Sequence, residues 1–280
     1  MTDFIQMAVL SAIAISCGIV GPFLVLKRST MFANSLSHTI LLGVAIAFLI
    51  TGSLSSIPSL LIGAFLAALM TAFFTGVLVR LFRLQEDASI GLVFTALFAL
   101  GITVVTLFTR DTHLGLEAVM GNADIVQWSD LKLALSLMGI NLAAILLFYK
   151  QFQLTSFDSS LAKILKISPS IFHFLLLFLV AATCIGAFRA VGVLLVLAFL
   201  VGPFLTARLF SHRLPWILLW TPAIGVLASV SGVVISRFFL TQFDLALSTG
   251  GIVAVLIGFI YVFAKCFTAL RASAFSAPLR

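Results

Sequence analysis

The chain has 280 residues, of which 62% are hydrophobic and only 9% are charged, and its mean hydropathy is +1.27. A soluble domain carries roughly 25% charged residues, so this composition excludes a soluble protein and indicates a helical membrane protein. The net charge of +7 comes from Lys and Arg residues between or beside apolar segments. That placement favours a role in membrane orientation, and we expect no nucleic-acid partner.

Nine apolar segments follow one another along the chain, each close to the roughly 20 residues of a membrane helix. The first lacks a basic start before it, so we expect a membrane helix there and not a signal peptide. The sixth and seventh are nearly continuous, and a break near Gly192 predicts a tight turn or a re-entrant bend. We therefore predict an all-α, polytopic fold in which residues 1–280 form a single transmembrane domain with membrane lipid around it. The predicted spans are 4–26, 32–51, 57–79, 90–109, 131–149, 171–188, 191–207, 215–236 and 248–264.

The 16 Lys and Arg residues divide unequally between the two sides that these spans define. One side holds Lys27, Arg28, Arg80, Arg83, Lys150, Lys163, Lys166, Arg208, Arg213, Lys265, Arg271 and Arg280, and the other holds only Arg110, Lys132, Arg189 and Arg237. Basic residues concentrate on the cytoplasmic side of a membrane protein. The bias predicts a multi-pass protein with its N-terminus outside and its C-terminus in the cytoplasm.

The second span carries polar side chains where lipid-compatible residues are expected. His38 lies ten residues after Arg28, which is about 15 Å along a helix and near the middle of a hydrocarbon layer about 30 Å thick. Asn34 lies one turn earlier on the same face, and Ser35 and Thr39 form a neighbouring pair at the same spacing. These groups are either hydrogen-bonding contacts between helices or a transient site for a cation, because neutral imidazole binds zinc, manganese and iron.

Two further positions have an ordinary and a functional interpretation. His113 lies in an acidic outer connection, where it either is a solvated loop residue or meets an incoming ion or a delivering protein. Arg189 ends the sixth span, where its side chain either reaches the outer interface or pairs with an acid of a neighbouring loop.

The longest predicted cytoplasmic connection, 150–170, contains a candidate docking helix. Asp158 is a favourable N-cap, and Pro169 ends the segment. After the cap, apolar residues recur at helical spacing, with Lys163 and Lys166 between them. This segment either lies on the membrane surface or docks into a groove of another protein. In the second case the anchors are Phe157, Leu161, Ile164 and Leu165.

Several ordered motifs resemble the bacterial metal-type ABC importer permeases, the membrane subunits of zinc, manganese and iron uptake systems. The family's pattern of a basic pair, an aromatic link, Gly-Asp-Ala-Leu-Ser-His and Pro-Gly matches here at Leu36, Ser37, His38 and Gly43. The resembling stretches are KRSTMFANSLSHTILLGVAIAF (27–48), EDASIGLVFTALFALGI (86–102), GNADIVQWSDL (121–131), LTSFDSSLAKILKIS (154–168) and FRAVGVLLVLAFLVGPFLTARLF (188–210).

The resemblance implies a permease in the bacterial inner membrane that moves a divalent metal ion and has no tightly bound cofactor. It implies cytoplasmic ATPase subunits that dock on the 150–170 connection, a second permease subunit and an extracytoplasmic metal-binding protein. His38 inherits the ion-path role, but the family's Asp falls on Asn34, whose neutral amide is a weaker ligand. The second permease subunit is either a copy of this chain or a different chain; the neutral Asn34 favours a heterodimer whose other subunit keeps the carboxylate.

A secondary transporter and a membrane assembly protein are the two alternatives to an ABC permease subunit. The sequence has no G-x-x-x-x-G-K-[ST] phosphate-binding loop and no other nucleotide signature, so we expect no enzymatic activity and no catalytic residues in this chain. A secondary transporter driven by an ion gradient usually carries carboxylates inside its spans, whereas here the acids fall at span ends or in loops. A membrane assembly protein that transports nothing would use the polar residues of the second span only for helix contacts.

Overall fold

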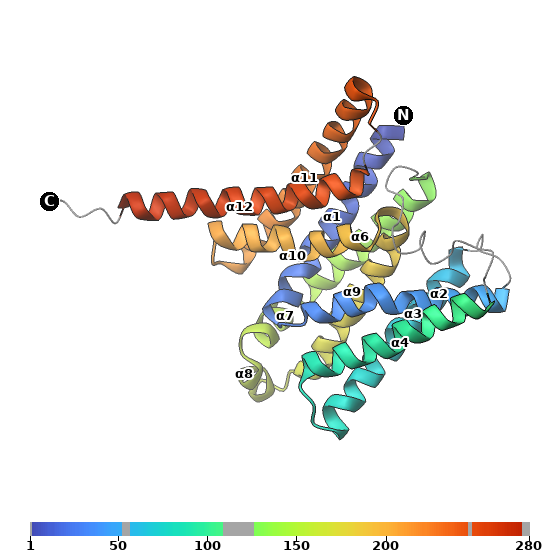
Figure 1. The fold of residues 1–280 in the computed structure, drawn as a ribbon. Coiled ribbons are helices and arrows are strands. Elements are labelled where there is room, and N and C mark those ends of the chain that lie inside the picture. The colour runs from blue at the N-terminus through green and yellow to red at the C-terminus, as the bar shows by residue number, and fades with distance from the viewer. Residues whose placement is uncertain (1, 52–56, 109–125, 246–247, 276–280) are drawn as a thin grey trace. The chain divides into compact units, whose positions relative to one another are not determined.

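The computed structural model describes residues 2–51, 57–108, 126–245 and 248–275, and every regular element in these ranges is a helix. Nine of the described helices are long and apolar enough to cross a membrane, as predicted. They are α1 (Thr2–Leu26), α2 (Thr30–Thr51), α3 (Ile57–Leu81), α4 (Glu86–Phe108), α6 (Trp128–Leu147), α9 (Pro169–Val191), α10 (Val193–Phe210), α11 (Leu214–Phe243) and α12 (Thr249–Phe275) (Figure 1). The prediction of an all-α polytopic fold is confirmed.

The largest differences from the predicted boundaries are in the last two spans. The prediction ended α11 near residue 236, where Arg237 interrupts the apolar run, but the helix continues to Phe243. The guanidinium of Arg237 forms an ion pair with Asp3 and donates to the side-chain oxygen of Gln6 at 3.4 Å. Because these partners on α1 satisfy the charge of Arg237, α11 continues past this residue. Asp244, in the left-handed conformation with φ 53°, is the C-cap that follows Phe243.

Gly192 alone separates α9 from α10. Its φ of 82° suits glycine and few other residues, and its N–H donates to the carbonyl of Phe188 at 2.8 Å. The predicted break therefore occurs as a tight turn at a single glycine.

The chain divides into two compact units. The first comprises Met1–Pro22, Ala123–Leu142 and Leu194–Arg280, and the second comprises Phe23–Asn122 and Ala143–Val193. The single transmembrane domain stays a prediction.

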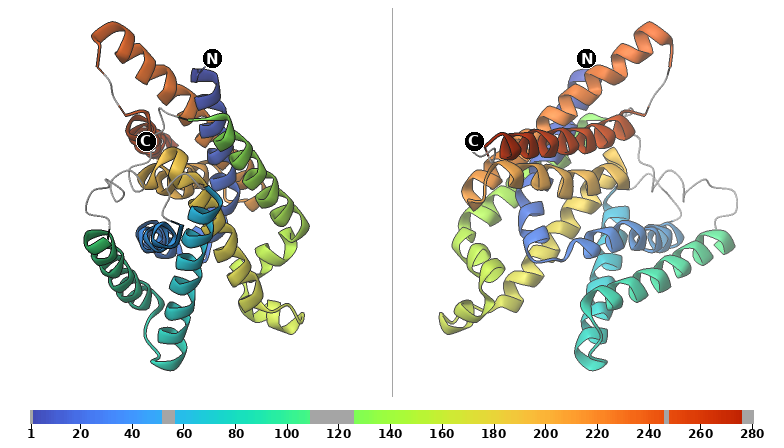
Figure 2. Two further views of the ribbon diagram at one scale, coloured as in Figure 1. Left: turned by 90° about the vertical axis from the view of Figure 1, so that its right-hand side faces the viewer. Right: turned by 60° about the vertical axis from the view of Figure 1, so that its left-hand side comes forward.

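In the first unit, polar and small residues allow close helix contacts. The amide of Asn141 on α6 donates to the hydroxyl of Ser16 on α1 at 2.6 Å, and both side chains are buried. Helix α11 packs against α12 (Figure 2). It also approaches α1 so closely that a Cβ at Gly18 would meet the backbone of Pro222. Such contacts stabilise helix pairs in lipid, where burial of apolar side chains contributes little.

In the second unit, α2 packs against both α3 and α4 (Figure 1). Gly43 and Gly63 lie where α2 and α3 meet, and a Cβ on either glycine would clash with the carbonyl oxygen of the other. This approach, together with the packing of α2 against α4, fixes the helix that carries the predicted ion-path residues.

Candidate metal-ion path and coupling surface

The polar residues of α2 divide into two groups with different surroundings. Ser35 and Thr39 are buried, and the hydroxyl of Thr71 on α3 donates to that of Thr39 at 3.0 Å. For Thr39, the interpretation as a hydrogen-bonding contact between helices therefore agrees with the structure.

His38 and Asn34 are each half-buried, one helical turn apart. The imidazole of His38 lies against two rings of α4, with centroid distances of 5.0 Å to Phe94 and 5.3 Å to Phe98. Contacts with aromatic rings restrict how the imidazole can turn. The sequence placed His38 within the second span, where α2 now lies, but it gave no indication that α4 would supply this aromatic neighbourhood.

His38 and Asn34 cannot by themselves complete a metal coordination sphere. Among the described residues, no group of three or more His, Cys, Asp or Glu side chains is placed to hold a metal ion. Transition metals take four or more ligands in closed sites. The described part of this chain therefore offers at most a partial site at this level of α2.

The two other candidate residues receive little structural support. His113 lies outside the described residues. Arg189 lies in the last turn of α9, so the helix continues for two residues beyond it, to Val191. Whether its side chain reaches the interface or pairs with an acid stays a prediction.

The predicted coupling segment forms two short helices, α7 (Tyr149–Phe157) and α8 (Ser159–Ile164). Asp158 is the N-cap of α8, as predicted: its Oδ1 accepts from the backbone N–H of Ser160 at 3.0 Å and of Leu161 at 2.9 Å. The predicted helix after Asp158 therefore forms, but its six residues are fewer than the two or three turns that we expected, and the separate helix α7 before it was not predicted.

The apolar side chains around α8 are exposed. Relative exposures are 62% for Phe157, 43% for Leu161, 77% for Ile164 and 57% for Leu165. Only Ala162 of α8 is buried. An apolar face that the described residues leave uncovered is available for lipid or for a partner protein.

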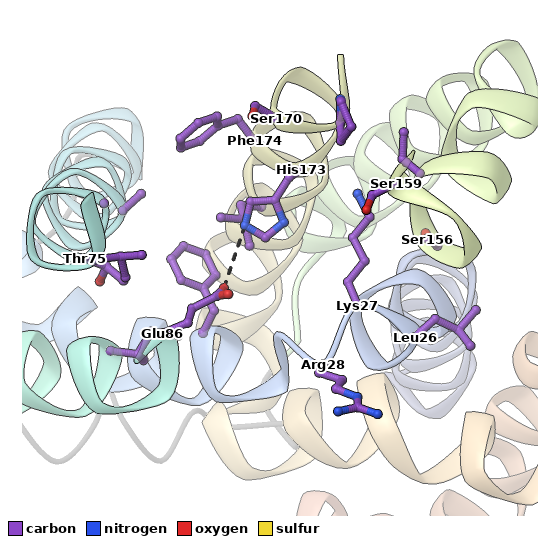
Figure 3. Close-up of a pocket in the computed structure, with 18 of the residues that line it drawn as sticks. Leu26, Lys27, Arg28, Thr75, Glu86, Ser156, Ser159, Ser170, His173 and Phe174 are labelled. Carbon is purple, nitrogen blue, oxygen red and sulfur yellow. Dashed lines mark ion pairs between the residues drawn. The ribbon is translucent and has the colours of Figure 1, made fainter. Parts of the chain in front are cut away.

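A cavity of about 530 Å³ lies within the second unit, at the ends of several membrane helices (Figure 3). Glu86 and His173 line it, with His173 Nε2 3.9 Å from Glu86 Oε1. Lys27 also lines it, and burial lowers the pKa of its ammonium from the ordinary 10.5 to about 8. The clustering of Lys27, Glu86 and His173 was not predicted from the sequence. The sequence did contain a sign of it: each of these residues lies near the end of a different predicted span, and all three ends lie on the predicted cytoplasmic side.

Comparisons with known proteins agree with this architecture. The model of the ABC 3 transport family matches residues 1–268. A probable metal transport system membrane protein from Chlamydia muridarum is 37% identical over 262 residues, covering 93% of this chain and 83% of that protein. The manganese transport system membrane protein MntD of Bacillus subtilis is 35% identical over 272 residues, covering 91% and 88%.

Two further matches extend the comparison. The chelated iron transport system membrane protein YfeD of Yersinia pestis is 33% identical over 235 residues, covering 83% of this chain and 77% of that protein. The solved structure of PsaBC from Streptococcus pneumoniae in complex with Fab matches with a TM-score of 0.78 and 25% identity, covering 92% of this chain and 89% of that one. The family match over nearly the whole chain and the nine apolar helices lead to one conclusion: this chain is a multi-pass membrane protein that belongs to the ABC 3 transport family.

Proposed function

We propose that this chain is the permease subunit of an ABC importer that carries a divalent transition metal ion across the bacterial cell membrane. The observation that carries the proposal is the position of His38, whose side chain is of a type that can bind metal ions, inside a membrane helix of an ABC 3 family member. An ion without its water is very costly to place in hydrocarbon, so the path must supply nitrogen and oxygen ligands. Relatives named for manganese and for chelated iron transport support such a cargo.

The ion path lies between two permease subunits, because the described residues of one chain supply only a partial site. His38 and Asn34 contribute one side of the path. Since Asn34 offers a neutral amide oxygen, the second subunit is a different chain that supplies a carboxylate at the matching level. A purified complex that holds two copies of this chain and no other permease would contradict this arrangement.

The energy for transport comes from separate ATPase subunits, which dock on α8 and its flanking residues. Phe157, Leu161, Ile164 and Leu165 present the apolar contacts, and the Asp158 cap holds the start of the helix. ATP binding tilts the two permease subunits and exposes the level of His38 to each side of the membrane in turn. An extracytoplasmic binding protein delivers the ion from outside.

The experiment is reconstitution of this chain in vesicles with its co-expressed ATPase and partner permease, followed by uptake assays for zinc, manganese and iron. The proposal predicts uptake that requires both ATP and the ATPase. Uptake by vesicles that contain this chain alone would instead support a secondary transporter. Intact assembly without uptake of any of the three metals would support a membrane assembly role.

A further inference from the structure

The cavity of the second unit combines a basic end with apolar walls. Three basic residues line it, namely Lys27, Arg28 and Arg80, against a single carboxylate, Glu86, which lies 3.9 Å from His173. The walls include Phe32, Ile90 and Leu177. Because three basic residues and one carboxylate line it, the cavity disfavours a metal cation and favours an anion, while the apolar walls favour a ligand that also has an apolar part.

The cavity also contains hydroxyl groups that no described residue satisfies. Thr75 lines the cavity on α3 and is only 8% exposed, yet its Oγ1 has no hydrogen-bond partner within the described part of the chain. Ser156 lines the same cavity, and its buried Oγ likewise has no hydrogen-bond partner among the described residues. A buried hydroxyl without a partner is costly, and an anion with several acceptor oxygens would remove that cost.

The cavity lies at helix ends, where the surface of the membrane is expected. Lys27 directly follows α1 and Glu86 begins α4 (Figure 3). Arg80 lies in the last turn of α3. Ends of membrane helices lie at the level of the lipid headgroups, and the distribution of basic residues predicts that this is the cytoplasmic side.

We propose that this cavity binds the phosphate headgroup of an anionic phospholipid from the cytoplasmic leaflet. The basic side chains and the Thr75 hydroxyl bind the phosphate oxygens, and the apolar walls contact the first part of the acyl chains. Basic cavities between membrane helices on this side are suited to such headgroups. The proposal is independent of which metal the protein carries.

The experiment measures the thermal unfolding midpoint of the full chain, purified in detergent with its co-purifying subunits, after adding lipid. We expect phosphatidylglycerol to raise the midpoint by roughly 5 °C more than phosphatidylcholine at equal concentration, because a ligand that binds only the folded state stabilises it. The double variant Lys27→Gln/Arg28→Gln should lose this difference. The control Arg208→Gln/Arg213→Gln removes two basic residues that do not line the cavity and should keep it.

Further variants cover the case in which the double variant does not fold. Lys27→Arg keeps the charge and should keep the response, whereas Thr75→Val should reduce it and Thr75→Ser should not. Equal midpoints with both lipids in the wild type, or an unchanged difference in the cavity variants, would overturn the proposal. So would a shift of the same size with millimolar inorganic phosphate, because the ligand would then be a free anion.

Discussion

The imidazole of His38 and the ring of Phe94 lie with their centroids 5.0 Å apart, where α2 packs against α4. A half-buried imidazole beside an aromatic ring keeps a defined orientation while part of it stays accessible. For a permease this is a suitable way to hold one ligand of a transient ion site, because the ion must bind and then leave.

A substitution at Asn34 tests the proposal that this side chain is a weak ligand because its amide is neutral. Asn34→Asp places a carboxylate one turn from His38, and a charged oxygen is a stronger ligand for a divalent cation. We expect manganese to bind the purified complex roughly tenfold more tightly, measured by equilibrium dialysis. Asn34→Gln keeps the amide and should bring no gain; an equal gain in both variants would show that charge is not the cause.

The Gly43–Gly63 contact predicts a sharp loss of stability on adding one methyl group. In Gly43→Ala, the new Cβ would meet the carbonyl oxygen of Gly63, so α2 and α3 must separate. Overpacking of this kind costs about 1–3 kcal/mol. Measurement of unfolding in detergent should show this cost.

Gly91 on α4 is the matched control, because a Cβ there would meet nothing within 4 Å. Gly91→Ala should leave the free energy of unfolding unchanged or slightly raised, since alanine favours helix more than glycine does. If the two alanine variants lose the same stability, the close contact of α2 and α3 is not the reason.

The exposed face of α8 predicts a loss of ATPase binding without a loss of fold. Leu161→Asp/Ile164→Asp places two charges on the apolar face, and we expect the ATPase to stop co-purifying while the permease remains monodisperse. Lys163→Asp introduces an acid on the same helix away from that face and should retain the ATPase. Unchanged co-purification with the double variant would exclude α8 as the docking helix.

Lys27 predicts an unusual pH dependence. Burial lowers the pKa of its ammonium to about 8, so between pH 8 and 10.5 the folded protein releases this proton while the unfolded chain keeps it. The contribution of Lys27 to stability therefore rises with pH across this window. Competitive acetylation should give a titration midpoint near 8 for Lys27, and a midpoint near 10.5 would refute this placement of the side chain.

The sequence predicted the spans well because each apolar run has the length that a bilayer imposes. It failed where a polar residue has a partner far along the chain. Arg237 looked like the end of a span, but Asp3 pairs with it and the helix continues. A pattern within one segment carries no information about such a partner.

Three helices are followed by a basic residue in the left-handed conformation, where a glycine is the usual signal of a helix end. Arg28, Arg83 and Lys166 follow the ends of α1, α3 and α8 with φ of 59°, 54° and 58°, a conformation that glycine usually provides. Basic residues there favour the negative end of the helix dipole. Without a glycine to mark them, these positions could not be predicted.

The site was predictable only in part. The positions of His38 and Asp158 follow from local spacing, and the structure places both as expected on α2 and before α8. The aromatic surroundings of His38 and the cavity beside Glu86 and His173 depend on how separate helices pack. No pattern along the chain specifies those contacts.

The most direct test of the transport account is uptake by the reconstituted complex with wild-type protein, His38→Ala and His212→Ala. His212 is exposed in the connection between α10 and α11, so its variant controls for loss of a histidine elsewhere. The account predicts that His38→Ala assembles with the ATPase but loses ATP-dependent metal uptake, while His212→Ala transports normally. Full uptake by an assembled His38→Ala complex would contradict the account and leave His38 as a helix-packing residue.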